Sequence, residues 1–263
     1  MNSPAMTFPE LQPAPGRGGT PGGGLAPAAG LVVGCASLAV PGKWNEDRVG
    51  VASPSAAEIA SHGVVVAVAD GIGGDGSGAY AAAVVVRSLL RDYYATPESW
   101  GPRRALDRVL RACNDWLHGQ NQRRREADAA VTTLSVVVFR AGHVHVAHVG
   151  DTRVYRLRAG VLKQLTIDHC WPRHDLRHVP KRAIGLDSHL VVDYADVVAE
   201  AGDAFLIATD GIWEVLGDRE LQLAVRAERD PQTCADALVA QSMARQSTYI
   251  RRNDASCPVV RTP

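Results

Sequence analysis

Runs of apolar residues, separated by polar and glycine-containing turns, divide most of the chain into strand-like and helix-like segments. Short runs rich in β-branched residues predict buried strands at 31–40, 64–70, 132–140, 143–150, 152–158 and 203–211. Apolar side chains recur at helical spacing over 78–95, 102–126, 217–228 and 231–246. The last run, 255–262, contains Pro258 and is therefore expected to be an edge strand.

The order of these segments indicates the fold class. Strands come first, and two helices, further strands, two more helices and a final strand follow. Helices and strands in separate blocks are typical of an α+β protein rather than of repeating βαβ units. Short turns separate the three strands between residues 132 and 158, which predicts an antiparallel meander.

Composition predicts a domain boundary and argues against nucleic acid and anionic membranes as main partners. Residues 1–29 are rich in Pro, Gly and Ala and have few large apolar residues, so we expect disorder there and one folded domain over 30–263. Of the 263 residues, 46% are hydrophobic and 21% are charged, and the formal net charge is zero. This balance gives no electrostatic reason to expect binding to nucleic acid or to an anionic membrane.

The cysteines and the apolar runs indicate in which cellular compartment the protein is expected. The chain has five cysteines, an odd number, and no CxxC pair, which fits a reducing cytoplasm better than a disulfide framework. The N-terminus has no secretory signal pattern, and no apolar run reaches the ~18–20 residues that span a bilayer. We expect a cytoplasmic protein without a membrane partner.

Acidic residues stand at strand ends or tight turns in four places. These are Asn45-Glu46-Asp47, Ala69-Asp70-Gly71, Gly150-Asp151-Thr152 and Thr209-Asp210-Gly211, with a fifth near the end at Asn253-Asp254-Ala255. A carboxylate just after a buried strand is held rigidly, and a following glycine lets the backbone turn sharply and expose a carbonyl. A single Asp-Gly is usually a plain turn, but several of them converging at one sheet edge would form an all-oxygen site.

Such a site favours hard divalent cations. Mg²⁺ and Mn²⁺ prefer oxygen ligands and keep some of their waters. Clustered carboxylates repel one another unless a cation or protons neutralise them. Two ions about 3.5–4 Å apart could clamp a phosphate and activate a water.

The acidic turns belong to a set of motifs that resembles the metal-dependent protein phosphatases, the type 2C serine/threonine phosphatases. The matching stretches are NED (45–47), ADGIGG (69–74), TTLSVVV (132–138), HVGDTRVYRL (148–157), LTIDH (165–169), ATDGIWEVL (208–216) and NDAS (253–256). They occur in the family's order and cover roughly residues 31–261. The resemblance implies a four-layer α/β/β/α sandwich of two mainly antiparallel sheets flanked by helix pairs, with the metal centre at one end.

The resemblance also implies a mechanism and roles for residues. Asp70 would bridge two metal ions, the carbonyl of Gly71 would bind one and Asp210 the other, while Asp151 would belong to a third, weaker site. A metal-bound water or hydroxide would attack phosphoserine or phosphothreonine, without a covalent phosphoenzyme. A serine/threonine kinase would be a natural partner. The expected residues are Lys43, Glu46 and Asp47 for catalysis, and Asp47, Asp70, Gly71, Asp151, Asp210 and Asp254 for metal.

Two departures from the family pattern concern substrate and metal binding. The family often has a phosphate-binding Arg where this chain has Gly42; the adjacent Lys43 could supply positive charge, but not a bidentate fork. The last motif normally reads Asp-Asn, whereas this chain has Asn253-Asp254. Asn253 could bind metal through its neutral amide oxygen, or Asp254 could do so if the turn shifts.

Two further positions differ from parts of the family. Glu214 stands where an Asp is frequent at the third metal. Ile72 replaces a His that acts as a general acid in animal members. An apolar residue at that position indicates a bacterial-type enzyme.

Other sites compete with this interpretation. Gly71, Gly73 and Gly76 satisfy GxGxxG after a strand, the dinucleotide fingerprint, but no second parallel strand with an acidic end follows. His143 and His145 would share a strand face, as in a transition-metal pair. We find no GxSxG elbow of a serine hydrolase.

Two interpretations stay open. The segment with His174 and His178, bounded by Pro172 and Pro180, is either a flap beside the active site or a plain loop. The inverted Asn253-Asp254 pair and the missing Arg leave room for a phosphatase-like domain that binds phosphoproteins with weak or no catalysis. Both Asp70 and Asp210 are present, which favours an active enzyme.

Overall fold

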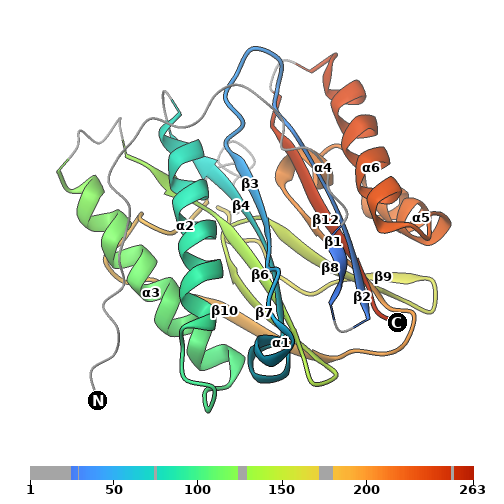
Figure 1. Ribbon diagram of the computed structural model, residues 1–263. Helices are drawn as coiled ribbons and strands as arrows, with labels where there is room; N and C mark the ends of the chain where they lie inside the picture. Colours follow the sequence, from blue (N-terminus) through green and yellow to red (C-terminus); the bar gives the residue numbers. More distant parts are fainter. Residues whose placement is uncertain (1–24, 29, 74–75, 124–128, 172–179, 250–251) are drawn as a thin grey trace.

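The computed structural model describes residues 25–28, 30–73, 76–123, 129–171, 180–249 and 252–263. In this part of the chain two antiparallel β-sheets face each other (Figure 1). The first sheet contains, in spatial order, β1 (Leu25–Ala28), β2 (Leu31–Leu38), β12 (Ala255–Arg261), β11 (Ala204–Ala208), β8 (Arg153–Arg158) and β9 (Val161–Gln164). The second contains β10 (Asp193–Val198), β7 (His143–Val149), β6 (Leu134–Arg140), β4 (Val64–Ile72) and β3 (Asp47–Val51), with β5 (Val131–Thr132) paired to β4.

Helices cover the outer face of each sheet. On the second sheet lie α2 (Ser77–Tyr94) and α3 (Pro102–Asn121); on the first lie α5 (Asp218–Ala227) and α6 (Pro231–Gln246), with the short α4 (Asp210–Trp213) after β11. A further short helix, α1 (Ala56–His62), lies between β3 and β4 in the chain. The predicted α+β fold, a four-layer α/β/β/α sandwich of two sheets flanked by helix pairs, is confirmed.

The continuous apolar run that ends in Asp70 becomes a strand buried on both faces. Val64, Val66 and Val68 pack between the two sheets. Val65 and Ala67 point the other way, into the core beneath α2 and α3. Because successive strand side chains alternate, a central strand with both faces covered needs apolar residues at every position.

The final strand is not at an edge, contrary to the prediction from Pro258. β12 lies between β2 and β11, and Pro258 stands opposite Cys35 of β2. Pro258 has no N–H to donate, and the register of β12 with β11 runs only as far as the Leu206–Val259 pair beside it. On β2, the Gln232 side chain of α6 accepts from the Cys35 N–H at 3.0 Å and donates to the Cys35 C=O at 2.8 Å. Gly34 has no side chain to keep the start of α6 away.

The predicted three-strand meander is wrong for its third strand. β6 and β7 pair antiparallel in the second sheet, but β8 pairs with β9 and β11 in the first. Tyr155 and Leu157 pack beneath the helices of the first sheet, whereas Val154 lies between the sheets. The alternating pattern requires two buried faces, but it does not say which sheet the strand joins.

Some boundaries also differ from the predictions. Residues 25–28, expected to be disordered, form β1 by pairing with the exposed edge of β2; the rest of the predicted disordered segment, 1–24 and 29, lies outside the described residues. The helix predicted to reach residue 126 ends at Asn121. Among the described helices, none is long and apolar enough to cross a membrane.

Candidate active site

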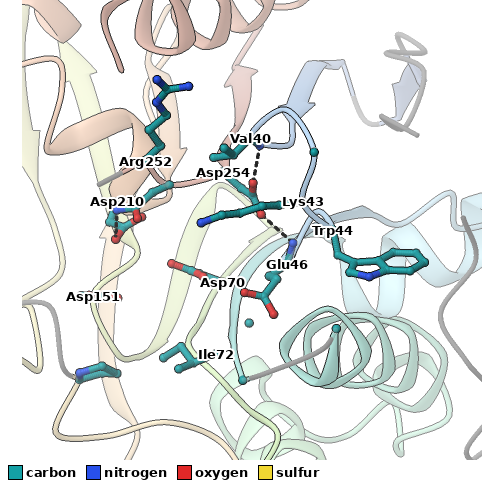
Figure 2. A pocket seen from close by; sticks show the side chains of 16 residues that line it. Val40, Lys43, Trp44, Glu46, Asp70, Ile72, Asp151, Asp210, Arg252 and Asp254 are labelled. Atoms are coloured by element: carbon teal, nitrogen blue, oxygen red, sulfur yellow. Dashed lines mark hydrogen bonds between the residues drawn. The ribbon is translucent and has the colours of Figure 1, made fainter. Parts of the chain in front are cut away.

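The acidic turns converge on one cavity of about 800 Å³ at one end of the two sheets. Figure 2 shows their side chains around this cavity, together with a loop of β2–β3 that carries Lys43 and Trp44. The wall contains Val40, Gly42, Lys43, Trp44, Glu46, Asp70, Gly71, Ile72, Gly73, Gly76, Asp151, Pro180, Asp210, Arg252, Asn253 and Asp254. Of the predicted site residues, only Asp47 is absent from this wall, because it lies just beneath it.

Asp47 and Asp70 stand opposite each other on β3 and β4. Asp47 is only 4% exposed, and Thr209, which directly follows β11 of the other sheet, donates its hydroxyl to the Asp47 carboxylate at 2.9 Å. Burial and the charge of Asp254 hold the pKa of Asp47 well above its ordinary value. Burial and the charge of Asp210 do the same for the pKa of Asp70. This carboxylate pair therefore favours bound protons or a cation.

The glycines after β4 allow backbone segments to come close together. The Gly71 N–H donates to the Glu46 carbonyl at 3.0 Å, and a side chain at position 71 would lie 2.0 Å from the carbonyl oxygen of Gly78. The Gly78 N–H in turn donates to the Glu46 carboxylate. The strand belongs to an antiparallel sheet, so the GxGxxG match does not lie in the parallel fold that binds dinucleotides.

Asp210 is held at the first turn of α4, and its neighbour is Asn253. The Asn253 side-chain amide donates to Asp210 Oδ2 at 2.7 Å. Gln246, near the end of α6, fixes this corner by accepting from the Asn253 N–H at 2.7 Å and donating to the Gly211 carbonyl at 3.0 Å. The amide of Asn253 thus occupies the place beside Asp210 that a metal-binding carboxylate could take.

Asp254 faces a different partner. Its two oxygens accept the backbone N–H groups of Val40 and Glu46, each at 2.7 Å (Figure 2). Burial raises the pKa of Asp254, and these two hydrogen bonds and Lys43 lower it in part. Asp254 therefore fastens the loop that carries Lys43 and Glu46, and its role as a metal ligand stays a prediction.

Asp151 lies across the cavity, at the turn between β7 and β8. It is 5% exposed, and burial raises its pKa to about 6, with the charge of Asp168 as the next cause. The Cys170 thiol donates to its carboxylate at 3.7 Å. His169 holds the same turn, because its Nδ1 accepts from the Gly150 N–H at 3.1 Å.

The cavity wall has two cationic residues in the described chain, Lys43, which was predicted, and Arg252, which was not. Lys43 extends into the cavity, where its charge lowers the pKa values of Glu46 and Asp254 (Figure 2). The pKa of Glu46 is still raised to about 7, first by burial. Arg252, which the sequence analysis missed, extends away from the carboxylates and donates to the Ser247 carbonyl at 2.8 Å. Its position next to Asn253 was the available signal.

The donor set fits a hard divalent cation. The described side chains at the cavity wall offer carboxylate and amide oxygens, and none of these described residues is a histidine or a cysteine. Among the described residues, no three His, Cys, Asp or Glu side chains form a compact ligand cluster. The carboxylates instead surround an open space, which suits Mg²⁺ or Mn²⁺ that keep several waters.

Of the two histidines considered as a transition-metal pair, His145 has an acidic partner. His143 and His145 are stacked with ring centroids 6.1 Å apart, and His145 pairs with Asp196 of β10. His148 is buried, and its Nδ1 pairs with the Ser135 hydroxyl at 3.0 Å. The segment considered as a flap, with His174 and His178, lies outside the described residues.

A two-sheet antiparallel sandwich with carboxylates at one end defines the class of metal-dependent phosphatases. Comparison with known proteins identifies the family. Residues 37–246 match the protein phosphatase 2C family, and the chain belongs to it. The predicted family is therefore confirmed, as is the prediction of a serine/threonine phosphatase.

Individual relatives agree with this assignment. The serine/threonine phosphatase stp of Listeria monocytogenes is 25% identical over 221 residues, covering 75% of this chain and 84% of the relative. The solved structure of PppA from Pseudomonas aeruginosa is 26% identical with a TM-score of 0.71, covering 87% of this chain and 97% of PppA. The catalytic domain of PstP, solved with two manganese ions, shares the fold at 24% identity and a TM-score of 0.72, covering 88% and 97% of the two chains.

Proposed function

We propose that this chain hydrolyses phosphoserine and phosphothreonine in proteins with Mn²⁺ or Mg²⁺ bound in the cavity. The observation that carries the proposal is the convergence of Glu46, Asp70, Asp151 and Asp210 from both sheets on one cavity beside Lys43. Burial holds the pKa values of Asp70 and Asp151 above their ordinary range. Such carboxylates bind a cation more readily than they stay ionised alone.

The residues divide into metal ligands and supports. Asp70 and the Gly71 carbonyl, with Asp210, would hold two ions, and Asp151 would hold a weaker third. Asp47 lies behind Asp70, where it adds negative charge and accepts from Thr209. When bound, the ions neutralise the carboxylates, polarise the phosphoryl oxygens and activate the attacking water.

Lys43 is proposed to attract the substrate phosphate. It extends from the loop that Asp254 fastens, so its position depends on the two hydrogen bonds of that carboxylate. Lysine acts as a point charge without the bidentate geometry of arginine. The neighbouring Ile72 offers no proton for the leaving group.

Further parts of the proposal concern cellular context. We expect a serine/threonine kinase that phosphorylates the same substrates, and we expect both proteins in the cytoplasm. The protein named stp, similar to this chain, is a serine/threonine phosphatase, which supports the substrate class for this chain.

The test is hydrolysis of p-nitrophenyl phosphate and of a phosphothreonine peptide, titrated with Mn²⁺ and Mg²⁺ and repeated with chelator. Turnover that requires metal and falls sharply in Asp70→Asn supports the proposal. Folded protein that binds the phosphopeptide without cleaving it, at millimolar metal, would instead support the phosphoprotein-binding domain.

A further inference from the structure

A second groove lies outside the catalytic cavity, along the outer edge of β3. Its volume is about 830 Å³, and it runs between β3, the loop after it and the exposed side of α2. Val86 and Leu90 of α2 pack over Gly50 of β3 and form an apolar floor. The groove is neither acidic nor part of the metal centre.

β3 is the last strand of its sheet, so one of its sides has no neighbouring strand in the described chain. The bonds from Gly71 N–H to Glu46 C=O and from Ala52 N–H to Val65 C=O show which residues of β3 face β4. Antiparallel pairing alternates, so the backbone N–H and C=O groups of Val49 and Val51 point outward. An extended peptide could therefore add to this edge as a further strand.

The groove carries a positive charge that the described residues do not neutralise. Arg48 comes from β3, and Arg87 and Arg91 come from α2. Arg91 pairs with Asp92 at 2.6 Å, but the side chains of Arg48 and Arg87 have no hydrogen-bond or ion-pair partner in the described part of the chain. The Nε of Arg48 is buried without a partner.

Among the described residues of the groove wall, one is acidic, and it is engaged elsewhere. Glu58 accepts from the Ser55 N–H at 2.8 Å in the capping box of α1. Unpaired guanidinium groups beside an apolar floor match an acidic segment with apolar residues at alternate positions. The positive charge of the groove therefore favours acidic extended peptides over neutral or basic ones.

The groove begins close to the active site along the chain. β3 starts at Asp47, directly after Glu46 on the catalytic wall. Trp44 lines the catalytic cavity and lies over Gly76, at the start of α2. A strand rises about 3.3 Å per residue, so a peptide on β3 extends about 13 Å from the catalytic end to Val51.

We propose that this groove docks the acidic, extended segment of the substrate protein that adjoins the phosphorylated residue. The segment adds to the edge of β3, and its carboxylates pair with Arg48 and Arg87 while the phosphoresidue lies in the catalytic cavity. This inference rests on the proposed phosphatase function and specifies the substrates that the enzyme prefers.

The test compares matched substrates of the full chain. Phosphothreonine peptides carry glutamate at alternate positions on the N-terminal or the C-terminal side, and a third peptide carries glutamine there. For at least one acidic peptide we expect kcat/KM about fivefold to tenfold above the glutamine peptide, as for two partly exposed charge pairs. N-methylation of its backbone at the docking positions should remove the advantage, because it removes the strand hydrogen bonds.

Variants assign the effect to the groove. Arg87→Glu should abolish the preference for acidic peptides, the milder Arg87→Gln should reduce it because Arg48 remains, and both should leave p-nitrophenyl phosphate hydrolysis unchanged. Arg219→Glu, on an exposed residue of α5 over the other sheet, is the matched control and should retain the preference. Wild-type protein that cleaves p-nitrophenyl phosphate but shows equal kcat/KM for all peptides would overturn the docking groove alone. Absence of any metal-dependent cleavage would overturn the proposed function instead.

Discussion

Asn253→Asp is the substitution that tests the arrangement of the metal centre most directly. The native amide donates to Asp210 Oδ2 at 2.7 Å, so it stabilises this carboxylate in the absence of metal. The variant replaces that donor by a second carboxylate at the same corner. We therefore expect the metal-free variant to be less stable than the parent protein. We expect its affinity for metal to be higher.

The magnitude follows from the contacts. A hydrogen bond to a charged group contributes about 1.5–3 kcal/mol. Two carboxylates about 4 Å apart add a repulsion of up to about 4 kcal/mol at an effective dielectric constant of 20, which proton uptake partly relieves. We expect the free energy of unfolding in chelator to fall by about 2–3 kcal/mol, which lowers Tm by roughly 4–12 °C for a domain of this size.

The assay measures thermal unfolding in chelator and in Mn²⁺, and the Mn²⁺ Kd by calorimetry. The anionic ligand should lower Kd by about tenfold, since ligand charge sets the affinity of such sites. Asn114→Asp is the control: this buried amide donates to the Asp187 carbonyl away from the cavity, so its loss should lower stability and leave Kd unchanged. A metal-free variant as stable as the parent, or an unchanged Kd, would refute the placement of Asn253 beside the metal.

Three other changes have defined outcomes. Burial raises the pKa of Glu46 to about 7 and of Asp151 to about 6, so between pH 5 and 7 the native state holds protons that the unfolded chain has released. The Tm measured in chelator should therefore fall as the pH rises from 5 to about 8. Saturating Mn²⁺ should flatten this dependence of Tm on pH. Lys43→Ala should raise KM for p-nitrophenyl phosphate severalfold, and Lys43→Arg should retain most of the affinity; equal KM values in all three proteins would exclude a phosphate contact. Gln232→Leu leaves both backbone groups of Cys35 without partners and should cost about 2–4 kcal/mol in a urea titration, against little change for the exposed Gln241→Leu.

Much of the fold could be predicted from local pattern. The apolar run before Asp70 implied a strand buried on both faces, and helical spacing located all four long helices. These predictions succeed because alternation and helical periodicity are set by which faces a segment must bury. The acidic turns could also be predicted from the sequence. Each of them is marked by residues adjacent in the chain, an apolar strand followed by a carboxylate and often a glycine.

Pairing between distant segments was decided only in the folded protein. β12 occupies a central position despite Pro258, because β11 pairs with it on one side and β2 on the other. β8 joins the first sheet because its side chains complete that core. β12 pairs with β2 and β8 pairs with β11, and both partner strands are distant in sequence. The local pattern of apolar residues carries no information about which distant strand becomes the neighbour.

The same limit applies to the Asn253-Asp254 pair. The sequence determined that an amide and a carboxylate stand at the start of the last strand, and it left open which of them faces the metals. The folded chain brings Asp210 and Gln246 to one side and the backbone of Val40 and Glu46 to the other. Each side chain is held by groups that only tertiary structure places within hydrogen-bonding distance, so the two neighbours in sequence have different roles.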